Sequence, residues 1–200
     1  MRKLLDFFKL LKKIRHEVKV VKPQLVYVTP NACGGAFYKD FVGGETVEMD
    51  AAMFQAEVAK RGLEGMVIYH GRKYGKDKEA FLNAADIFVF PTFYHNECFP
   101  LVLLEAMEHG LPCISTTEGG IPGIVDDGKT GFLVPKHDVA VLADKIQLLL
   151  NDSVLRSNMG KVGREKFEKE FTLEVFEKRM IWILEHIVYP ILTWLGVPRD

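Results

Sequence analysis

The chain has 200 residues, 48% of them hydrophobic, which is enough to bury a core without disulfide bonds or bound metal ions. Its formal net charge of -1 at pH 7 argues against nucleic acid as a partner, because proteins that bind phosphate backbones usually carry a clear basic excess. Three cysteines, Cys33, Cys98 and Cys113, form no CxxC pair. This pattern favours a cytoplasmic protein in which they are buried small side chains.

The N-terminal residues form a distinct basic unit. Residues 1–22 contain eight Lys or Arg and only two acidic residues. Apolar residues recur at helical spacing in residues 3–18, with basic residues on the opposite face, so we predict an amphipathic helix there. It either packs on its own sheet or makes peripheral contact with the inner membrane surface. Its lysines interrupt the apolar run too often for an export signal.

A short strand is predicted in residues 24–29 and a second helix in residues 31–41. At residues 41–44 a strand end follows that helix with no connecting loop, so we predict a domain boundary there. Residues 1–41 would be a helix–strand–helix segment and residues 42–200 the main domain. In the main domain we predict helices at 50–61, 76–84, 100–109, 138–150, 153–169 and 172–188, and strands at 66–70, 87–91, 113–116 and 132–134.

The alternation of strands and helices predicts the fold class. Strands joined by helices of about ten residues pair in parallel through right-handed crossovers, which gives a doubly wound, Rossmann-like α/β sheet. Ligands of such sheets bind at the carboxyl ends of the strands. The apolar residues 180–197 are interrupted by charge and by Pro190, so we interpret them as a packed helix rather than a membrane span.

The strand at 87–91 leads through a loop into the helix that starts near Pro100. Pro100 suits the first helical position, because its missing N–H has no partner to lose there. The free amides that follow it and the helix dipole make this helix start a seat for a phosphate. Glu105 lies on the same helix among apolar residues, where a carboxylate needs a hydrogen-bonding partner. A sugar or ribose diol would provide one.

Further motifs surround this helix in a fixed order. Glu97 and Glu105 are separated by seven residues that include Phe99, and the flanking motifs are Ala85-Asp86, Ala106-Met107, Gly110-Leu111-Pro112, Gly119-Gly120-Ile121-Pro122 and the run from Asp127 to Pro135. This series resembles the nucleotide-sugar-binding donor domain of glycosyltransferase family 4, whose members are retaining enzymes of the GT-B fold. The resemblance covers roughly residues 41–187.

The resemblance implies a role for each matching residue. Glu97 would be the catalytic residue that binds hydroxyls of the transferred sugar, and Glu105 would hold the ribose. Gly71 and Arg72 would frame the base, and Gly119 and Gly120 would form a donor loop. The distal phosphate would bind at the helix start, formed by Cys98, Phe99, Pro100, Leu101 and Val102.

The same resemblance implies partners and chemistry. The donor would be a nucleoside diphosphate sugar and the acceptor a glycan or lipid-linked molecule, as in polysaccharide biosynthesis. Transfer would proceed with retention, and neither a metal nor a further cofactor would take part. Histidines such as His70, His95 and His109 have no Cys or carboxylate partners at metal-ligand spacing, which agrees with that expectation.

The sequence departs from the family at several points. Pro100 and Gly123 replace residues that are usually Gly and Glu, and no segment matches the basic Gly-Arg and Lys-Gly pair that clasps the diphosphate. Two GT-B domains need about 300 residues or more, and residues 1–41 resemble part of the acceptor domain. These features suggest a shortened enzyme. They also support a rival interpretation, a non-catalytic sugar-nucleotide-binding or interaction module.

Simpler roles exist for both glutamates. Glu97 could cap the helix that begins near Pro100, which is a common role for an acidic residue just before a first turn. Glu105 could form an ion pair with a lysine from another helix.

Overall fold

The computed structural model describes residues 25–29, 40–43, 50–64, 67–93, 97–188, 191, 194 and 195. The chain divides into two compact units, Met1–Arg164 and Glu165–Asp200, and each is described by itself. The basic helix predicted in residues 3–18, and with it the membrane hypothesis, lies outside the described residues. So do Cys33, His95 and most of the second predicted helix.

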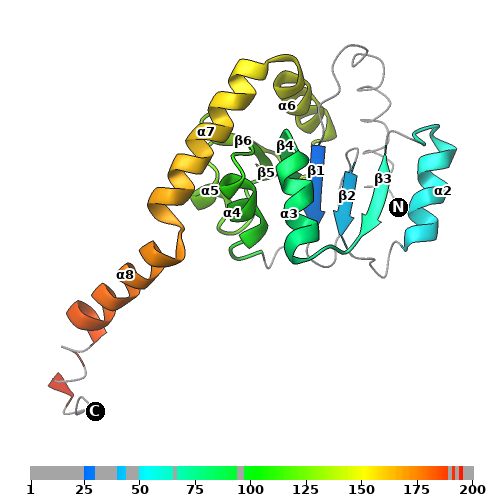
Figure 1. Cartoon of the computed structure of the whole chain (residues 1–200). Helices are drawn as coiled ribbons and strands as arrows, with labels where there is room; N and C mark the ends of the chain where they lie inside the picture. Colours follow the sequence, from blue (N-terminus) through cyan, green and yellow to red (C-terminus); the bar gives the residue numbers. More distant parts are fainter. Residues whose placement is uncertain are drawn as a thin grey trace. The chain divides into compact units, whose positions relative to one another are not determined.

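The first unit is built on a six-stranded sheet in which every pairing is parallel (Figure 1). The strand order is β3-β2-β1-β4-β5-β6. The chain therefore builds outward from β1 to one edge and then crosses back to build the other half from β4, as in a doubly wound Rossmann-like fold. The strands are β1 (Leu25–Thr29), β2 (Asp40–Gly43), β3 (Ile68–Gly71), β4 (Ile87–Phe90), β5 (Cys113–Thr116) and β6 (Gly131–Val134).

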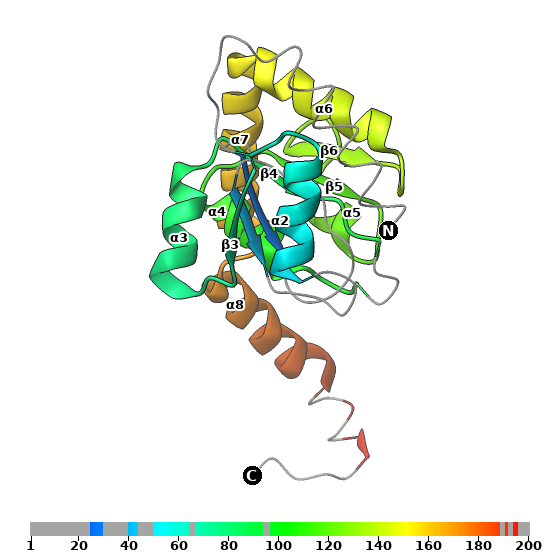
Figure 2. The ribbon, with the colours of Figure 1, turned by 90° about the vertical axis from the view of Figure 1, so that its right-hand side faces the viewer.

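Helices cover both faces of this sheet. Viewed from the β3 edge, α3 and α4 lie on one side and α2 and α6 on the other (Figure 2). This is the arrangement that right-handed crossovers impose on a sheet whose strand order reverses once. The helices are α2 (Ala51–Lys60), α3 (Gly75–Ala84), α4 (Leu101–Glu108), α5 (Ile121–Ile124), α6 (Val139–Asn151) and α7 (Ser153–Glu170), the last of which begins in the first unit and continues into the second.

The core lies around β4, β5 and α4. All four residues of β4 and of β5 are buried, and α4 adds five buried residues. Leu103 and Met107 of α4 are fully inaccessible, as are Phe88 and Ile114 of the two strands. Each such side chain contributes roughly 1.5–3 kcal/mol when it leaves water. The helix that carries the predicted phosphate seat is therefore held rigidly against the centre of the sheet.

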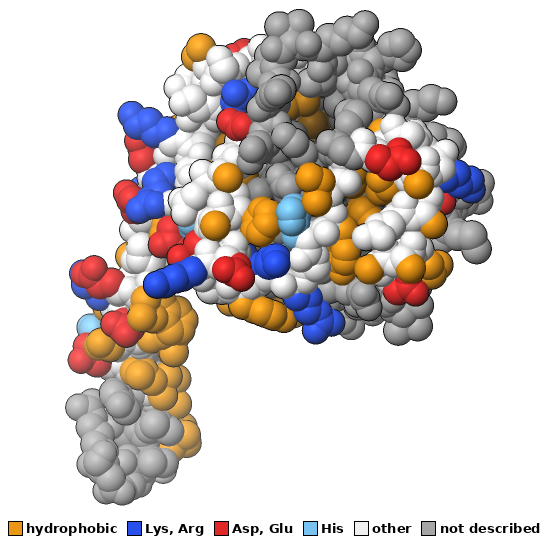
Figure 3. All heavy atoms as spheres, turned by 45° about the vertical axis from the view of Figure 1, so that its right-hand side comes forward, with side chains coloured by type: hydrophobic (Ala, Val, Ile, Leu, Met, Phe, Trp, Pro, Cys, Tyr) orange, Lys and Arg blue, Asp and Glu red, His pale blue; other side chains and the backbone are white. Residues whose placement is uncertain are grey.

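The second unit contains the end of α7, α8 (Leu173–Ile183) and a π-helical turn, η1 (Leu184–Val188). None of the α8 or η1 residues is buried, although the sequence predicts that residues 180–197 form a packed helix. Apolar residues of α8 such as Phe176, Ile181 and Trp182 are exposed, and hydrophobic side chains line one side of this segment in the view of Figure 3. No described helix is long and apolar enough to cross a membrane.

Most predicted elements are present with ends shifted by one or two residues, and two findings add to them. The strand end expected at residues 41–44 is β2, and it includes Asp40 and Phe41, which the sequence had assigned to a preceding helix. The short helix α5 was not predicted, because its sequence Ile-Pro-Gly-Ile has little helix propensity. β1 pairs with both β2 and β4. The predicted domain boundary between residues 41 and 42 stays a prediction.

Candidate functional site

The predicted site lies where the strand order reverses. β1 pairs with β2 on one side and with β4 on the other, and in open α/β sheets ligands bind at the carboxyl ends of the strands at such a switch point. The loops after β4 and β5 are pinned together at their start. Ser115 Oγ donates a hydrogen bond to the Phe90 carbonyl oxygen at 2.6 Å, and the Thr116 hydroxyl donates to the Thr92 carbonyl oxygen.

Gly119 and Gly120, which we call the glycine turn, pack directly on the backbone of Glu97 and Cys98. The Gly120 amide donates to the Cys98 carbonyl oxygen at 2.7 Å. A Cβ on Gly119 would lie 1.5 Å from the Glu97 carbonyl oxygen, and one on Gly120 would lie 2.4 Å from that of Cys98. Gly119 also has a φ of 48°, in the region that favours glycine. The structure therefore brings four predicted site residues into contact.

The start of α4 is left open in the described structure. Pro100 is the residue before the helix, with φ -72° and ψ 105°, rather than its first helical residue, and no side chain caps it. Glu97 therefore does not cap this helix through a hydrogen bond, and its electrostatic effect on the helix start stays a prediction. Among the described residues, the amides of Leu101 and Val102 have no hydrogen-bond partner. Two unpaired amides at the positive end of a helix dipole form an anion-binding arrangement.

Glu105 has one paired oxygen and one unpaired oxygen. Lys78 of α3 places its Nζ 2.5 Å from Glu105 Oε1, so the predicted ion pair with a lysine of another helix is confirmed. The second oxygen, Oε2, is buried and has no hydrogen-bond partner among the described residues. A buried carboxylate oxygen without a donor is costly. The ion pair therefore leaves Oε2 able to accept a hydrogen bond from a ligand hydroxyl.

Glu97 lies in an electrostatically unfavourable position for a carboxylate. Partial burial raises the pKa of Glu97 above its usual 4.5, and the nearby charge of Glu118 raises this pKa further. Glu118 is itself buried, with 7% of its surface exposed, and forms an ion pair with Lys136. Both effects favour the protonated form of Glu97.

The remaining predicted residues lie at the edges of this arrangement. Phe99 and Cys98 are exposed beside the helix start. Gly71 and Arg72 lie at the carboxyl end of the edge strand β3, separated from β4 by β2 and β1. No hydrogen bond or ion pair joins Arg72 to Glu97 or Glu105 in the described structure. The prediction that the cysteines are buried is confirmed for Cys113, whose burial raises its thiol pKa, and is wrong for Cys98.

Four residues that the fold brings to the site were not predicted from the sequence. Lys78, Glu118, Lys136 and His137 contact the predicted residues or the loops that carry them. Three of them lie in or directly after loops at the carboxyl ends of strands, which is the position where ligands of this fold class bind. Their position after predicted strands was the feature of the sequence that could have identified these three residues. The pairing of Lys78 with Glu105 spans 27 residues and has no local signature.

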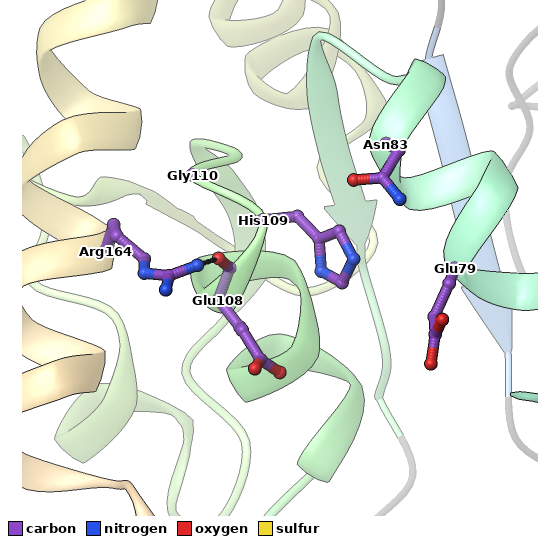
Figure 4. Close-up of a pocket in the computed structure, with 6 residues that line it drawn as sticks. All are labelled: Glu79, Asn83, Glu108, His109, Gly110 and Arg164. Atoms are coloured by element: carbon purple, nitrogen blue, oxygen red, sulfur yellow. Dashed lines mark hydrogen bonds between the residues drawn. The ribbon is translucent and has the colours of Figure 1, made fainter. Parts of the chain in front are cut away.

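A separate groove of about 520 Å³ lies at the other end of α4 (Figure 4). There the Arg164 guanidinium donates to the carbonyl oxygen of Glu108, which satisfies one of the backbone acceptors left at a helix C-terminus. None of the residues predicted for the site lines this groove. Its lining consists of Glu79, Asn83, Glu108, His109, Gly110 and Arg164.

The glycine turn yields a test by substitution. Gly119→Ala should separate the turn from Glu97 and Cys98, because its Cβ would overlap backbone that cannot move independently. We expect the affinity for a nucleoside diphosphate sugar, the donor that the sequence predicts, to fall at least tenfold. Gly123→Ala is the matched control, because a Cβ there meets nothing within 4 Å. Calorimetry would measure the affinity of each variant for this ligand. Equal affinities of Gly119→Ala and Gly123→Ala would contradict the close packing of the glycine turn on Glu97 and Cys98.

The raised pKa of Glu97 yields a test by titration. Between the usual pKa of 4.5 and its raised value, the folded protein binds more protons than the unfolded chain. This carboxylate therefore reduces stability as pH rises through that window. Glu118→Gln removes one cause of the shift and leaves Lys136 unpaired, so the Glu97 pKa should fall towards 4.5. Carbon-13 NMR of the carboxyl groups would measure it. An unchanged Glu97 titration would contradict the coupling to Glu118.

The family and the fold of this chain are shared with known proteins. Residues 40–166, more than half of the chain, match the family described as glycosyl transferases group 1. The chain is 39% identical over 103 residues to the capsular polysaccharide biosynthesis glycosyltransferase CapM of Staphylococcus aureus, which covers 52% of this chain and 27% of CapM. It is 42% identical over 96 residues to the N-acetyl-alpha-D-glucosaminyl L-malate synthase of Bacillus anthracis, covering 48% of this chain and 24% of that enzyme.

Solved structures show the same fold. Anabaena Alr3699/HepE, in a crystal structure with UDP and glucose, superposes with a TM-score of 0.70 at 18% identity, over 90% of this chain and 53% of HepE. The chain thus matches about a quarter of the length of the two curated relatives and about half of a solved structure. On the family match and this shared fold, the chain belongs to the group 1 glycosyl transferases.

Proposed function

We propose that this chain is the donor-binding half of a retaining glycosyltransferase. It would transfer a sugar from a nucleoside diphosphate sugar to a glycan or lipid-linked acceptor. One observation carries the proposal. The start of α4 is open, Glu97 precedes it in the chain, and Glu105 in the same helix keeps a buried carboxylate oxygen without a partner among the described residues. These are the groups that a phosphate and a ribose would satisfy.

The diphosphate would bind at the start of α4. The unpaired amides of Leu101 and Val102 would donate to the distal phosphate, and the helix dipole would stabilise its negative charge. In the reaction, the bond between the anomeric carbon and the phosphate oxygen breaks, and a bond to the acceptor oxygen forms on the same face. The acceptor proton passes to the leaving phosphate. Donors fixed on that phosphate stabilise the charge that develops there.

The two glutamates would orient the rest of the donor. Glu105 Oε2 would accept a hydrogen bond from a ribose hydroxyl, while Lys78 holds the other oxygen. Glu97 would bind hydroxyls of the transferred sugar. Its raised pKa reflects partial exclusion from water, which strengthens such hydrogen bonds. Gly71 and Arg72 at the end of β3 would frame the base, and neither a metal nor a further cofactor would be needed.

The relatives support this assignment. The HepE structure holds UDP and glucose, which makes UDP-glucose a sensible first donor. CapM carries a name from capsular polysaccharide biosynthesis, which favours a glycan or lipid-linked acceptor. A non-catalytic sugar-nucleotide-binding module remains the second candidate, because the sequence has no match to the basic pair of the family's donor domains.

The proposed function can be tested by binding and turnover together. Calorimetry should detect binding of UDP or GDP and of the matching sugar nucleotide, and Glu97→Gln should weaken only the sugar nucleotide, because UDP lacks the sugar. Release of the nucleoside diphosphate would separate the two candidates: turnover indicates a transferase, and binding without turnover indicates a module. A protein that binds none of these molecules at millimolar concentration would contradict both.

The ion pair between Lys78 and Glu105 yields a sharper prediction. If Glu105 Oε2 binds the ribose, the protein should prefer UDP over 2′-deoxy-UDP or 3′-deoxy-UDP by about tenfold, the value of one charge-assisted hydrogen bond. Lys78→Met should reduce that preference, because Glu105 loses the contact that orients it. Lys76→Met, an exposed lysine on the same helix, is the matched control. Equal affinity of the wild-type protein for all three nucleotides would exclude the ribose contact.

A further inference from the structure

The loop after β6 reaches the loops that follow β4 and β5. Lys136 forms an ion pair with Glu118 in the loop after β5. The ring of His137 packs on that of Phe93 in the loop after β4, with the ring centroids 4.6 Å apart. Two consecutive residues of one loop therefore hold the two loops that carry the glycine turn and Glu97.

The backbone of this third loop is held in an uncommon conformation. His137 has a φ of 62° and is the one non-glycine residue with positive φ in the part of the chain that the structure describes. Such residues persist where their surroundings hold them, and they are found often at functional sites. The next residue, Asp138, caps α6 by accepting a hydrogen bond from the Val141 amide at 3.0 Å. The helix cap and the contacts to Phe93 and Glu118 hold the loop on both sides.

The ion pair lies between a buried charge and the surface. Only 9% of the Glu118 side chain is exposed, against 45% of that of Lys136. A buried carboxylate needs a compensating charge, so Lys136 fixes the position of Glu118. Glu118 directly precedes the glycine turn, which in turn packs on the backbone of Glu97 and Cys98. A displacement of Glu118 is therefore transmitted to Glu97 through backbone contacts.

We propose that Lys136 is a positioning residue for the sugar-binding carboxylate of Glu97, acting through Glu118 and the glycine turn, with His137 and Phe93 as the second attachment of the same loop. This inference rests on the proposed function, because it assigns Glu97 to the sugar part of the donor. It predicts that the loop after β6 affects recognition of the sugar and leaves recognition of the nucleotide to α4 and the end of β3.

The test measures the affinities for UDP and for UDP-glucose. If another UDP- or GDP-sugar binds more tightly than UDP-glucose, that sugar nucleotide and its free nucleoside diphosphate are used instead. Lys136→Met should weaken the sugar nucleotide about tenfold and change the affinity for the free nucleotide less than twofold. Lys136→Arg should restore the wild-type affinity for the sugar nucleotide, because it keeps the positive charge beside Glu118. Lys129→Met, an exposed lysine in the turn before β6, should behave like the wild-type protein. In the same variants, carbon-13 NMR should show the Glu97 pKa rising in Lys136→Met, because the charge of Glu118 is then uncompensated.

A second variant protects the test against simple unfolding. Glu118→Gln combined with Lys136→Met removes both charges and leaves no buried charge unpaired, so it should fold and still lose affinity for the sugar nucleotide. Equal losses of affinity for nucleotide and sugar nucleotide would indicate a general structural effect and overturn the proposal. Wild-type affinities in both variants would overturn it as well. A wild-type protein that binds no nucleotide would instead refute the proposed function, and this inference would fail with it.

Discussion

The candidate site depends on the close approach of two backbone segments. The glycine turn after β5 contacts the backbone of Glu97 and Cys98 at distances that leave no room for a Cβ. Strands β4 and β5 bring the two loops to the same sheet edge, and the hydrogen bonds from Ser115 and Thr116 hold them there. If the loops were farther apart, Glu97 would no longer have a fixed position relative to the start of α4.

Rigidity at this point comes from the core beneath it. α4 is anchored by buried side chains on its inner face, so its first turn cannot shift to find partners for its open amides. Such anchoring favours anion binding, because it keeps the free amides of the first turn pointing in one direction. The burial of Leu103 and Met107 therefore contributes to the proposed function as well as to stability.

The charges around the site are arranged in pairs that leave specific atoms open. Lys78 neutralises Glu105 and leaves Oε2 unpaired, and Lys136 neutralises Glu118 beside Glu97. Each lysine comes from an element other than that of its partner. The pairs thus connect α3 to α4 and the loop after β6 to the loop after β5. Glu105 and Glu118 are thus each held by a lysine from another part of the chain.

Local patterns in the sequence were sufficient for much of this protein. The strands and helices between residues 50 and 170 follow from hydrophobic periodicity and from Gly and Pro at their ends, and their alternation predicts a parallel doubly wound sheet. The motif residues from Glu97 to Gly120 were found because they lie in a short, ordered series. The exceptions are β2, whose first two residues the pattern assigned to the preceding helix, and α5, whose sequence Ile-Pro-Gly-Ile has little helix propensity.

Only the tertiary structure decided the strand order, the contact of the glycine turn with Glu97 and the pairing of each lysine with its glutamate. Lys78 and Glu105 are 27 residues apart in the sequence. Lys136 lies close to Glu118 because β5 pairs with β6 and the loops that follow these strands are neighbours. Periodicity and capping depend on neighbours within one or two turns of chain, so the sequence determines them directly. Contacts between loops depend on which strands pair, and that choice is made by the burial of the whole core.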